Sequence, residues 1–263
     1  MKEYNTIRAI KNKNVLEVTL NRPNLHNAFN EEVISELVDC FTIVNNEKSI
    51  RLITLKGEGK SFCAGADLNW MKKMKDYSEE DNFKDSKELA SLFDTINNCS
   101  LPVVAFIHGA ILGGGCGLIS VCDYVLCKEG SKFGFTETRL GLLPAVISPF
   151  VIAKIGESYA RAYFPSGAKF TEDQALNMGL VHEVATDISW EESKKRVTNS
   201  FLKSAPDAAK ESKVLIKNVL SLNTKEEVLN YTSKTIAKIR IGNEAQEGMN
   251  SLLEKRLPNW MTE

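Results

Sequence analysis

Two glycine-rich segments constrain this chain more than any other feature, because each follows a predicted strand and precedes a predicted helix. The first is Ser61–Leu68 (SFCAGADL), which comes after a strand ending at Leu55. The second is His108–Gly117 (HGAILGGGCG), which comes after a strand ending at Ile107. Small residues let the backbone approach a ligand closely, and the first turn of a helix presents unpaired N–H groups. Two such turns side by side can direct one N–H each at a single oxygen, which is the arrangement of an oxyanion hole.

The same glycines also fit a purely structural role, in which they only permit tight turns and close helix packing. The segment His108–Gly117 is not a P-loop, because no Gly-Lys-Ser/Thr follows its glycines. Its glycine spacing does not match the G-x-G-x-x-G pattern of dinucleotide-binding proteins either. From these residues alone, the ligand-binding and the structural interpretations both stay open.

The remaining periodicity predicts an α/β core followed by helices. Strand patterns occur at residues 15–20, 50–55, 103–107 and 123–127, with helical patterns at 30–41 and 70–99. After about residue 145 the strand signals fade, and the expected helices are 158–163, 171–177, 191–202, 206–220 and 225–239. We therefore expect residues 1–200 to form an α/β core and residues 201–263 to form a helical C-terminal region.

Composition and charge argue against several classes of partner. The 33 Lys and Arg residues nearly balance the 34 Asp and Glu residues, so no global basic field attracts nucleic acid or anionic lipid. No apolar run approaches the roughly 18 residues of a membrane span, and no signal-peptide pattern opens the chain. The six cysteines form no CxxC pair and the three histidines lie far apart, so we expect no metal site. Reduced cysteines without an export signal predict a cytoplasmic protein.

A third segment, Phe133–Pro144 (FGFTETRLGLLP), supplies a candidate acid/base in Glu137. A carboxylate among apolar neighbours is expected to have a raised pKa, as proton transfer near neutral pH requires. A surface or helix-capping glutamate is the alternative interpretation.

In this order and spacing, the three segments resemble the signature of the crotonase (enoyl-CoA hydratase/isomerase) superfamily. The likeness runs from the turn at Asn21–Ala28 to Leu253–Pro258 near the C-terminus. It implies the ClpP/crotonase-like α/β spiral of repeated ββα units, with a helical C-terminal trimerisation region and trimers that often pair as hexamers. It also implies an acyl-CoA thioester as the substrate and no cofactor beyond the CoA that the substrate carries. Neither a nucleic acid nor a membrane is an expected partner.

The resemblance also assigns roles to individual residues. The N–H groups of Ala66 and Gly114 would bind the thioester oxygen and stabilise an enolate, while Glu137 would be the acid/base. Lys255 would reach the CoA phosphates of a neighbouring subunit. The residues implied along the path of CoA are His26, Ala28, Ala64, Asp67 and Leu68.

The position of Gly117 separates two reactions within this superfamily. In its hydratases two glutamates commonly hold the attacking water, and the second would fall at Gly117. A single glutamate at the Glu137 position is the arrangement of Δ3,Δ2-enoyl-CoA isomerases. Both reactions use the same enolate-stabilising hole, so the family does not by itself name the reaction.

A narrower resemblance favours hydration. The segments Asp67–Met71, Glu137–Phe150 and Ala160–Phe164 are similar to bacterial 3-methylglutaconyl-CoA hydratases of leucine breakdown. The substrate of that group carries a distal carboxylate, for which Arg139 is the candidate partner. A structural ion pair with a neighbouring acid is the other interpretation of Arg139. The resulting prediction is hydration of 3-methylglutaconyl-CoA, or of a similar branched or carboxylated 2-enoyl-CoA.

Three alternatives to hydration stay open at this stage. One is Δ3,Δ2 isomerisation by a single glutamate. Another is a protein that binds acyl-CoA without turnover, because Gly117 removes one carboxylate. The third is RNA binding through Lys72, Lys73 and Lys75, although the acidic residues around them make a poor phosphate track.

Overall fold

The computed structural model describes residues 2–45 and 47–261, and its central element is a six-stranded sheet. The strand order is β1-β2-β3-β4-β6-β9; β1 and β2 form an antiparallel hairpin, and every later pairing is parallel. The strands of this sheet are β1 (Ile7–Asn12), β2 (Val15–Leu20), β3 (Leu52–Gly57), β4 (Val103–Ile107), β6 (Tyr124–Lys128) and β9 (Glu183–Ala185).

A second, three-stranded sheet contains β5 (Ala110–Leu112), β7 (Lys132–Gly134) and β8 (Lys169–Thr171), in that order. Strand β5 follows β4 directly and β7 follows β6 directly, so the chain passes twice from the large sheet to the small one, and α4 separates the two passages. This alternation is the ββα repeat that the resemblance to crotonases implied, and the mixed α/β fold is confirmed.

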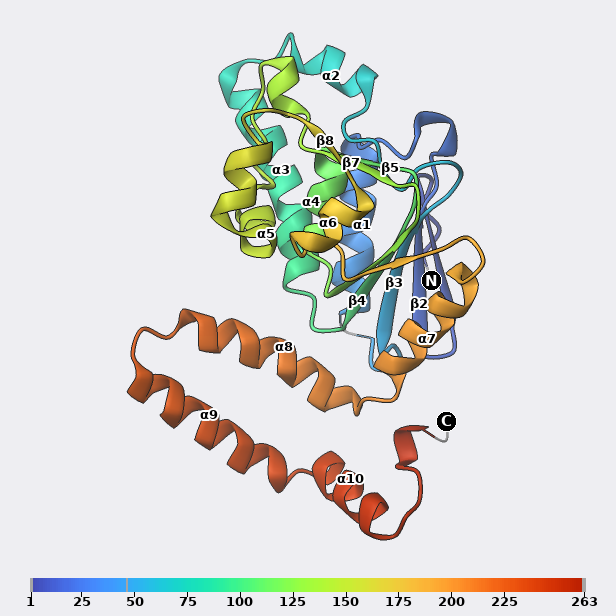
Figure 1. Cartoon of the computed structure of the whole chain (residues 1–263), viewed down its shortest axis with the longest axis vertical. Helices are drawn as coiled ribbons and strands as arrows, with labels where there is room; N and C mark the ends of the chain where they lie inside the picture. Colours follow the sequence, from blue (N-terminus) through green and yellow to red (C-terminus); the bar gives the residue numbers. More distant parts are fainter. Residues whose placement is uncertain (1, 46, 262–263) are drawn as a thin grey trace.

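Helices cover both faces of the large sheet, as Figure 1 shows. Along β4, Val103, Ala105 and Ile107 pack into the larger core, whereas Val104 and Phe106 pack into the smaller core under α7. The helices are α1 (Glu31–Val44), α2 (Leu68–Met74), α3 (Glu79–Asn97), α4 (Gly114–Ser120), α5 (Ser148–Tyr163), α6 (Glu172–Asn177), α7 (Trp190–Leu202), α8 (Pro206–Ser221), α9 (Lys225–Arg240) and α10 (Asn243–Leu253).

The last three helices, α8 to α10, lie apart from the two sheets in Figure 1. No residue of α8 or α9 is buried, although both helices carry apolar side chains. A cavity of about 400 Å³ opens between α8 and α9, lined by apolar side chains that include Leu215 and Ile236. The expected division of the chain near residue 200 stays a prediction.

Several elements differ from the sequence-based expectations. The helical segment expected at 70–99 is two helices, because Asp67 caps α2 and Ser78 caps α3 with a complete capping box. The helix expected at 158–163 is the second half of α5, which bends at Gly156. The strand signals in the sequence fade after about residue 145, yet two three-residue strands, β8 and β9, follow. No helix in residues 2–45 and 47–261 is both long and apolar enough to cross a membrane.

Candidate active site

The two glycine-rich segments lie side by side, as the sequence predicted. The N–H of Cys63 donates to the carbonyl of Ala110 (3.2 Å), and the N–H of Leu112 donates back to the carbonyl of Cys63 (3.0 Å). These bonds join the segment before α2 to the segment before α4. The starts of two helices are therefore fixed next to each other at one edge of the structure.

The loop that carries His26 and Ala28 is bonded to the other side of the first glycine-rich segment. The N–H of Ala64 donates to the carbonyl of His26 (3.0 Å), and the N–H of Phe29 donates to the carbonyl of Gly65 (2.8 Å). Three segments distant in sequence thus form one continuous hydrogen-bonded layer. The His26–Ala28 loop therefore lies beside Ala64, and the role of these residues along the path of CoA stays a prediction.

Ala66 and Gly114 occupy equivalent positions in the two turns. Each directly follows a glycine with a left-handed backbone, Gly65 with φ of 98° and Gly113 with φ of 49°. A Cβ on Gly65 would lie 3.2 Å from the carbonyl oxygen of Leu112, so close packing also requires glycine there. Within the described residues, neither the Ala66 nor the Gly114 N–H donates to a backbone carbonyl. Two free donors are what an oxyanion hole needs, and this role stays a prediction.

Glu137 points its carboxylate at the second of these turns. It opens a short 3-10 helix, Glu137–Leu140, and its Oε1 lies 3.1 Å from the position that a Cβ on Gly113 would take. A Cβ at 113 would make a tighter contact with this oxygen than most Cβ atoms do, and the positive φ of Gly113 also favours glycine there. The Glu137 carboxylate therefore lies next to the residue that precedes the predicted donor Gly114.

The surroundings of Glu137 favour its protonated form. Desolvation by burial raises the pKa of this carboxyl above its ordinary value, and the Glu137 backbone N–H offsets part of that rise. Its Oε2 is buried and has no hydrogen-bond partner within the protein. A buried carboxylate oxygen without a partner is unusual and is a common feature of a group that exchanges protons with a ligand.

Gly117 lies one helical turn beyond Gly113 and is completely enclosed. A Cβ at this position would be 2.3 Å from Cγ2 of Ile147 and 3.1 Å from Cε1 of Phe93. The place where the two-glutamate hydratases carry their second acid is therefore filled by apolar side chains. The sequence shows that Gly117 stands where those hydratases have a glutamate. It does not show the contact with Ile147, which lies thirty residues further along the chain.

The side chain of Asp67 is engaged within the protein. It accepts a hydrogen bond from the Arg22 guanidinium (2.7 Å) and one from the Asn69 backbone N–H (2.7 Å), which caps α2. Burial alone would raise the pKa of Asp67, but these partners hold it below its usual value. Arg22 also donates to the carbonyl of Ala28 (2.6 Å), so this pair fixes the loop beside the site. A contact between Asp67 and CoA through its side chain stays an untested prediction.

The other predicted binding residues are exposed. Leu68 is 74% exposed at the start of α2, and Lys255 follows the end of α10. Arg139 is exposed and lies against Gly167. No acid in the described part of the chain forms an ion pair with Arg139, so the alternative of a structural ion pair is not observed. His26 is exposed as well. The assignment of His26, Leu68, Arg139 and Lys255 to substrate binding stays a prediction.

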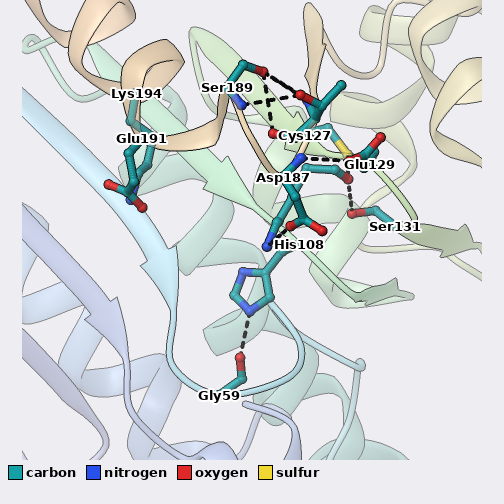
Figure 2. Close-up of polar contacts among 11 residues, drawn as sticks. Gly59, His108, Cys127, Glu129, Ser131, Asp187, Ser189, Glu191 and Lys194 are labelled. Atoms are coloured by element: carbon teal, nitrogen blue, oxygen red, sulfur yellow. Dashed lines mark hydrogen bonds and ion pairs between the residues drawn. The ribbon is translucent and has the colours of Figure 1, made fainter.

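The three histidines make structural hydrogen bonds. Figure 2 shows the imidazole of His108 donating to the carbonyl of Gly59, at 2.8 Å, below the turns that carry Ser131 and Ser189. Nδ1 of His182 accepts from the backbone of Val125, and His26 contacts Ser61. Among residues 2–45 and 47–261, no cluster of His, Cys, Asp and Glu has the arrangement of a metal site.

The chain is similar in sequence to a known family of enzymes. Residues 10–263 match the family model described as enoyl-CoA hydratase/isomerase. A short-chain-enoyl-CoA hydratase of Clostridium acetobutylicum is 27% identical over 260 residues, covering 97% of each chain. A mitochondrial Δ(3,5)-Δ(2,4)-dienoyl-CoA isomerase of Dictyostelium discoideum is 29% identical over 268 residues, or 97% of this chain and 91% of that one.

Solved structures agree with the fold. The crystal structure of an enoyl-CoA hydratase from Shewanella pealeana superimposes with a TM-score of 0.94 at 33% sequence identity. The match covers 98% of this chain and 97% of that one. The similarity therefore includes the C-terminal helices as well as the sheets.

Proposed function

The chain belongs to the enoyl-CoA hydratase/isomerase family, within the crotonase superfamily, and from that premise we propose that it adds water to a 2-enoyl-CoA thioester. The main support is the position of the Glu137 carboxylate. It lies next to Gly113, and its buried Oε2 has no hydrogen-bond partner within the protein. Family membership alone does not decide between hydration and isomerisation, so the choice of hydration depends on the residues of the site.

The mechanism follows from where charge develops. Glu137 removes a proton from water as the water oxygen bonds to C3 of the substrate, and electrons move onto the thioester oxygen as an enolate. The N–H groups of Ala66 and Gly114 stabilise that oxygen, and one such donor contributes about 3 kcal/mol to the transition state. The enolate then takes a proton at C2 from Glu137, which returns the carboxylate to its starting state.

The proposed substrate is 3-methylglutaconyl-CoA or a similar branched or carboxylated 2-enoyl-CoA. The support is the resemblance of the segments around Asp67 and Glu137 to hydratases of that substrate. Arg139 adds to it, because its guanidinium is exposed two residues from Glu137 and has no acidic partner in the described chain. A substrate carboxylate would supply that partner.

Isomerisation of a 3-enoyl-CoA is the second candidate function, and the packing at Gly117 favours it. One carboxylate is sufficient to move a proton between C2 and C4, whereas water addition benefits from a second group that holds the water. An isomerase is also among the relatives of this chain.

Binding without turnover has less support. In α2, Lys73 is paired with Glu31 (3.1 Å), which reduces the positive charge available to an RNA phosphate. An acyl-CoA-binding protein without activity would have no need for a buried, unpartnered carboxylate, which costs stability.

We further propose that the chain works as a homotrimer or a hexamer, with its helical C-terminal region, residues 201–263, forming the contacts. The exposed apolar residues of α8 to α10 support this arrangement. The proposed location is the cytoplasm.

A substrate panel tests the reaction and the acyl group together. Purified protein is assayed against 3-methylglutaconyl-CoA, crotonyl-CoA and a 3-enoyl-CoA, with hydration and isomerisation followed separately. We expect hydration of 3-methylglutaconyl-CoA to have the highest kcat/KM. Arg139→Gln should raise KM for the carboxylated substrate about tenfold and leave crotonyl-CoA unaffected, while the exposed Arg161→Gln on α5 serves as the matched control. Isomerisation as the only activity would contradict the proposal.

A further inference from the structure

Two glycines one turn apart lie at the start of α4, and the first of them faces the Glu137 carboxylate. Gly113 faces Oε1 of Glu137, at 3.1 Å from its ideal Cβ position, and the N–H of Gly117 donates to the carbonyl of Gly113 (3.2 Å). Gly113 is the non-helical N-cap of α4, so this hydrogen bond closes the first turn of the helix and places Gly117 one turn beyond the residue that faces Glu137. The ideal Cβ of Gly117 points toward Ile147 and Phe93.

A side chain at 117 would extend toward the carboxylate if it had room. In a helix the Cα–Cβ bond tilts toward the N-terminus, so a long side chain at 117 would lean back over the turn that contains Gly113. That is the turn against which Glu137 packs. A carboxylate on such a side chain would therefore approach Glu137.

Ile147 occupies the space that such a side chain would need. Its Cγ2 lies 2.3 Å and its Cβ 3.0 Å from the ideal Cβ of Gly117, so a rotamer change alone does not remove the overlap. Phe93, at 3.1 Å, is held between Phe29 (ring centroids 6.4 Å apart) and Phe150 (6.0 Å). Ile147 is 3% exposed and precedes the first turn of α5. The nearest obstacle is therefore a single, buried aliphatic side chain.

We infer that Ile147 is a specificity-determining residue, because it excludes a second carboxylate from the Glu137 site and so limits the reaction to one protein acid/base. The inference rests on the proposed function for its catalytic part. It makes Gly117 and Ile147 a coupled pair, in which the residue tolerated at one position depends on the other. Changing Gly117 alone should damage packing, and changing both should create a site with two carboxylates.

The packing part is tested by thermal unfolding of four proteins: wild type, Gly117→Ala, Ile147→Ala and the double variant. Gly117→Ala should lower the unfolding midpoint by about 5 °C in the wild-type background, because overpacking is destabilising. In the Ile147→Ala background the same change should lower the midpoint much less, because the 2.3 Å overlap with Cγ2 is gone and alanine favours helix more than glycine; the Cβ at 147 and Phe93 still lie 3.0 and 3.1 Å away. Equal effects of Gly117→Ala in both backgrounds would overturn the inference.

The catalytic part compares Gly117→Glu/Ile147→Ala with Gly117→Gln/Ile147→Ala, which has the same shape without the charge. The carboxylate variant should hydrate crotonyl-CoA with a kcat/KM about tenfold or more above the amide variant. Its pH profile should also gain an ionisation that the amide variant lacks, since two close carboxylates do not ionise independently. Identical rates and pH profiles, or a carboxylate variant that does not fold although Ile147→Ala does, would overturn the inference.

Failure of the proposed function gives a different result. If the wild-type protein turns over no enoyl-CoA, the function is wrong, and the thermal measurements still decide whether Ile147 excludes side chains at 117.

Discussion

The surroundings of Glu137 offer little stabilisation to an ionised carboxylate. Its carboxylate approaches the Gly113 turn closely, but one of its oxygens is buried without a partner. Burial raises its pKa, so less free energy separates its protonated and ionised forms near neutral pH than in an exposed glutamate. The burial that would suit Glu137 to its proposed acid/base role should also make its ionised form a cost to the folded state.

Replacing Glu137 by glutamine should therefore stabilise the protein at neutral pH. The folded-state pKa lies above the unfolded one, so stability is full below the unfolded value and decreases as pH rises through the folded value. Glutamine does not ionise and avoids that loss. We expect Glu137→Gln to raise the free energy of unfolding at pH 7 by on the order of 1 kcal/mol.

Chemical denaturation at several pH values measures this effect. The advantage of Glu137→Gln should shrink as pH falls toward the ordinary range of glutamate. A variant less stable than wild type at pH 7, or an advantage that grows in acid, would show that the carboxylate is not desolvated as described.

At this scale the sequence supplied candidate residues for the site but not their contacts. The resemblance to crotonases assigned the roles of Ala66, Gly114 and Glu137, and these roles stay predictions. The contact between Gly117 and Ile147 and the ion pair of Arg22 with Asp67 join residues thirty or more positions apart. Such contacts depend on how helices and loops pack, which short-range patterns do not encode.

At the level of elements, the site depends on three loops that hold each other in place. Backbone hydrogen bonds join the His26–Phe29 loop to the first glycine-rich turn, and that turn to the second. The ion pair between Arg22 and Asp67 adds a side-chain connection whose carboxylate is only 5% exposed. A shift in this layer would move the Ala66 N–H, so the stability and the activity of the site are linked.

Removing the carboxylate of Asp67 should test that link. Asp67→Ala leaves the Arg22 guanidinium without its partner, and breaking a buried pair typically costs about 3 kcal/mol. We expect the variant to lose stability by that amount and to lose turnover as well. Glu31→Ala, which breaks the exposed pair with Lys73, is the matched control and should change stability by less than about 1 kcal/mol. Equal losses in the two variants would contradict the account of the loop layer.

Element length explains part of what the sequence predicted, although β1 with six residues and α10 with eleven were not predicted. Strands β2 and β4 and helices α1, α7, α8 and α9 have enough residues for a clear period, and the sequence predicted each of them. Strands β5, β7, β8 and β9 have three residues each, too few for any alternation to be recognised. Their pairing is decided by tertiary contacts, so the second sheet emerged only in the structure.

At the scale of the whole molecule, the C-terminal helices carry exposed apolar side chains, whereas the apolar side chains of the core are buried. Ile241, Leu252 and Leu253 are 78–80% exposed on or next to α10. Together with the cavity between α8 and α9, this is far more clustered apolar exposure than isolated surface residues account for. Association of copies would cover it.

A charge on this surface should disrupt the proposed assembly. We expect the protein to elute as a trimer or a hexamer when molar mass is measured by light scattering. Leu253→Glu should shift it to smaller species, because a charged side chain is costly at a buried interface. Ile188→Glu, at an isolated apolar residue that is 98% exposed, is the control and should leave the mass unchanged. A monomeric wild-type protein would contradict the proposal.

The central claim is that one carboxylate, Glu137, performs the proton transfers of an acyl-CoA reaction beside two backbone donors. Its most direct test is the kcat of Glu137→Gln on the best substrate of the panel, with the affinity for acyl-CoA measured in parallel. We expect a loss of about three orders of magnitude in kcat with near-normal binding. Near-normal turnover by Glu137→Gln would remove Glu137 from the mechanism and contradict the claim.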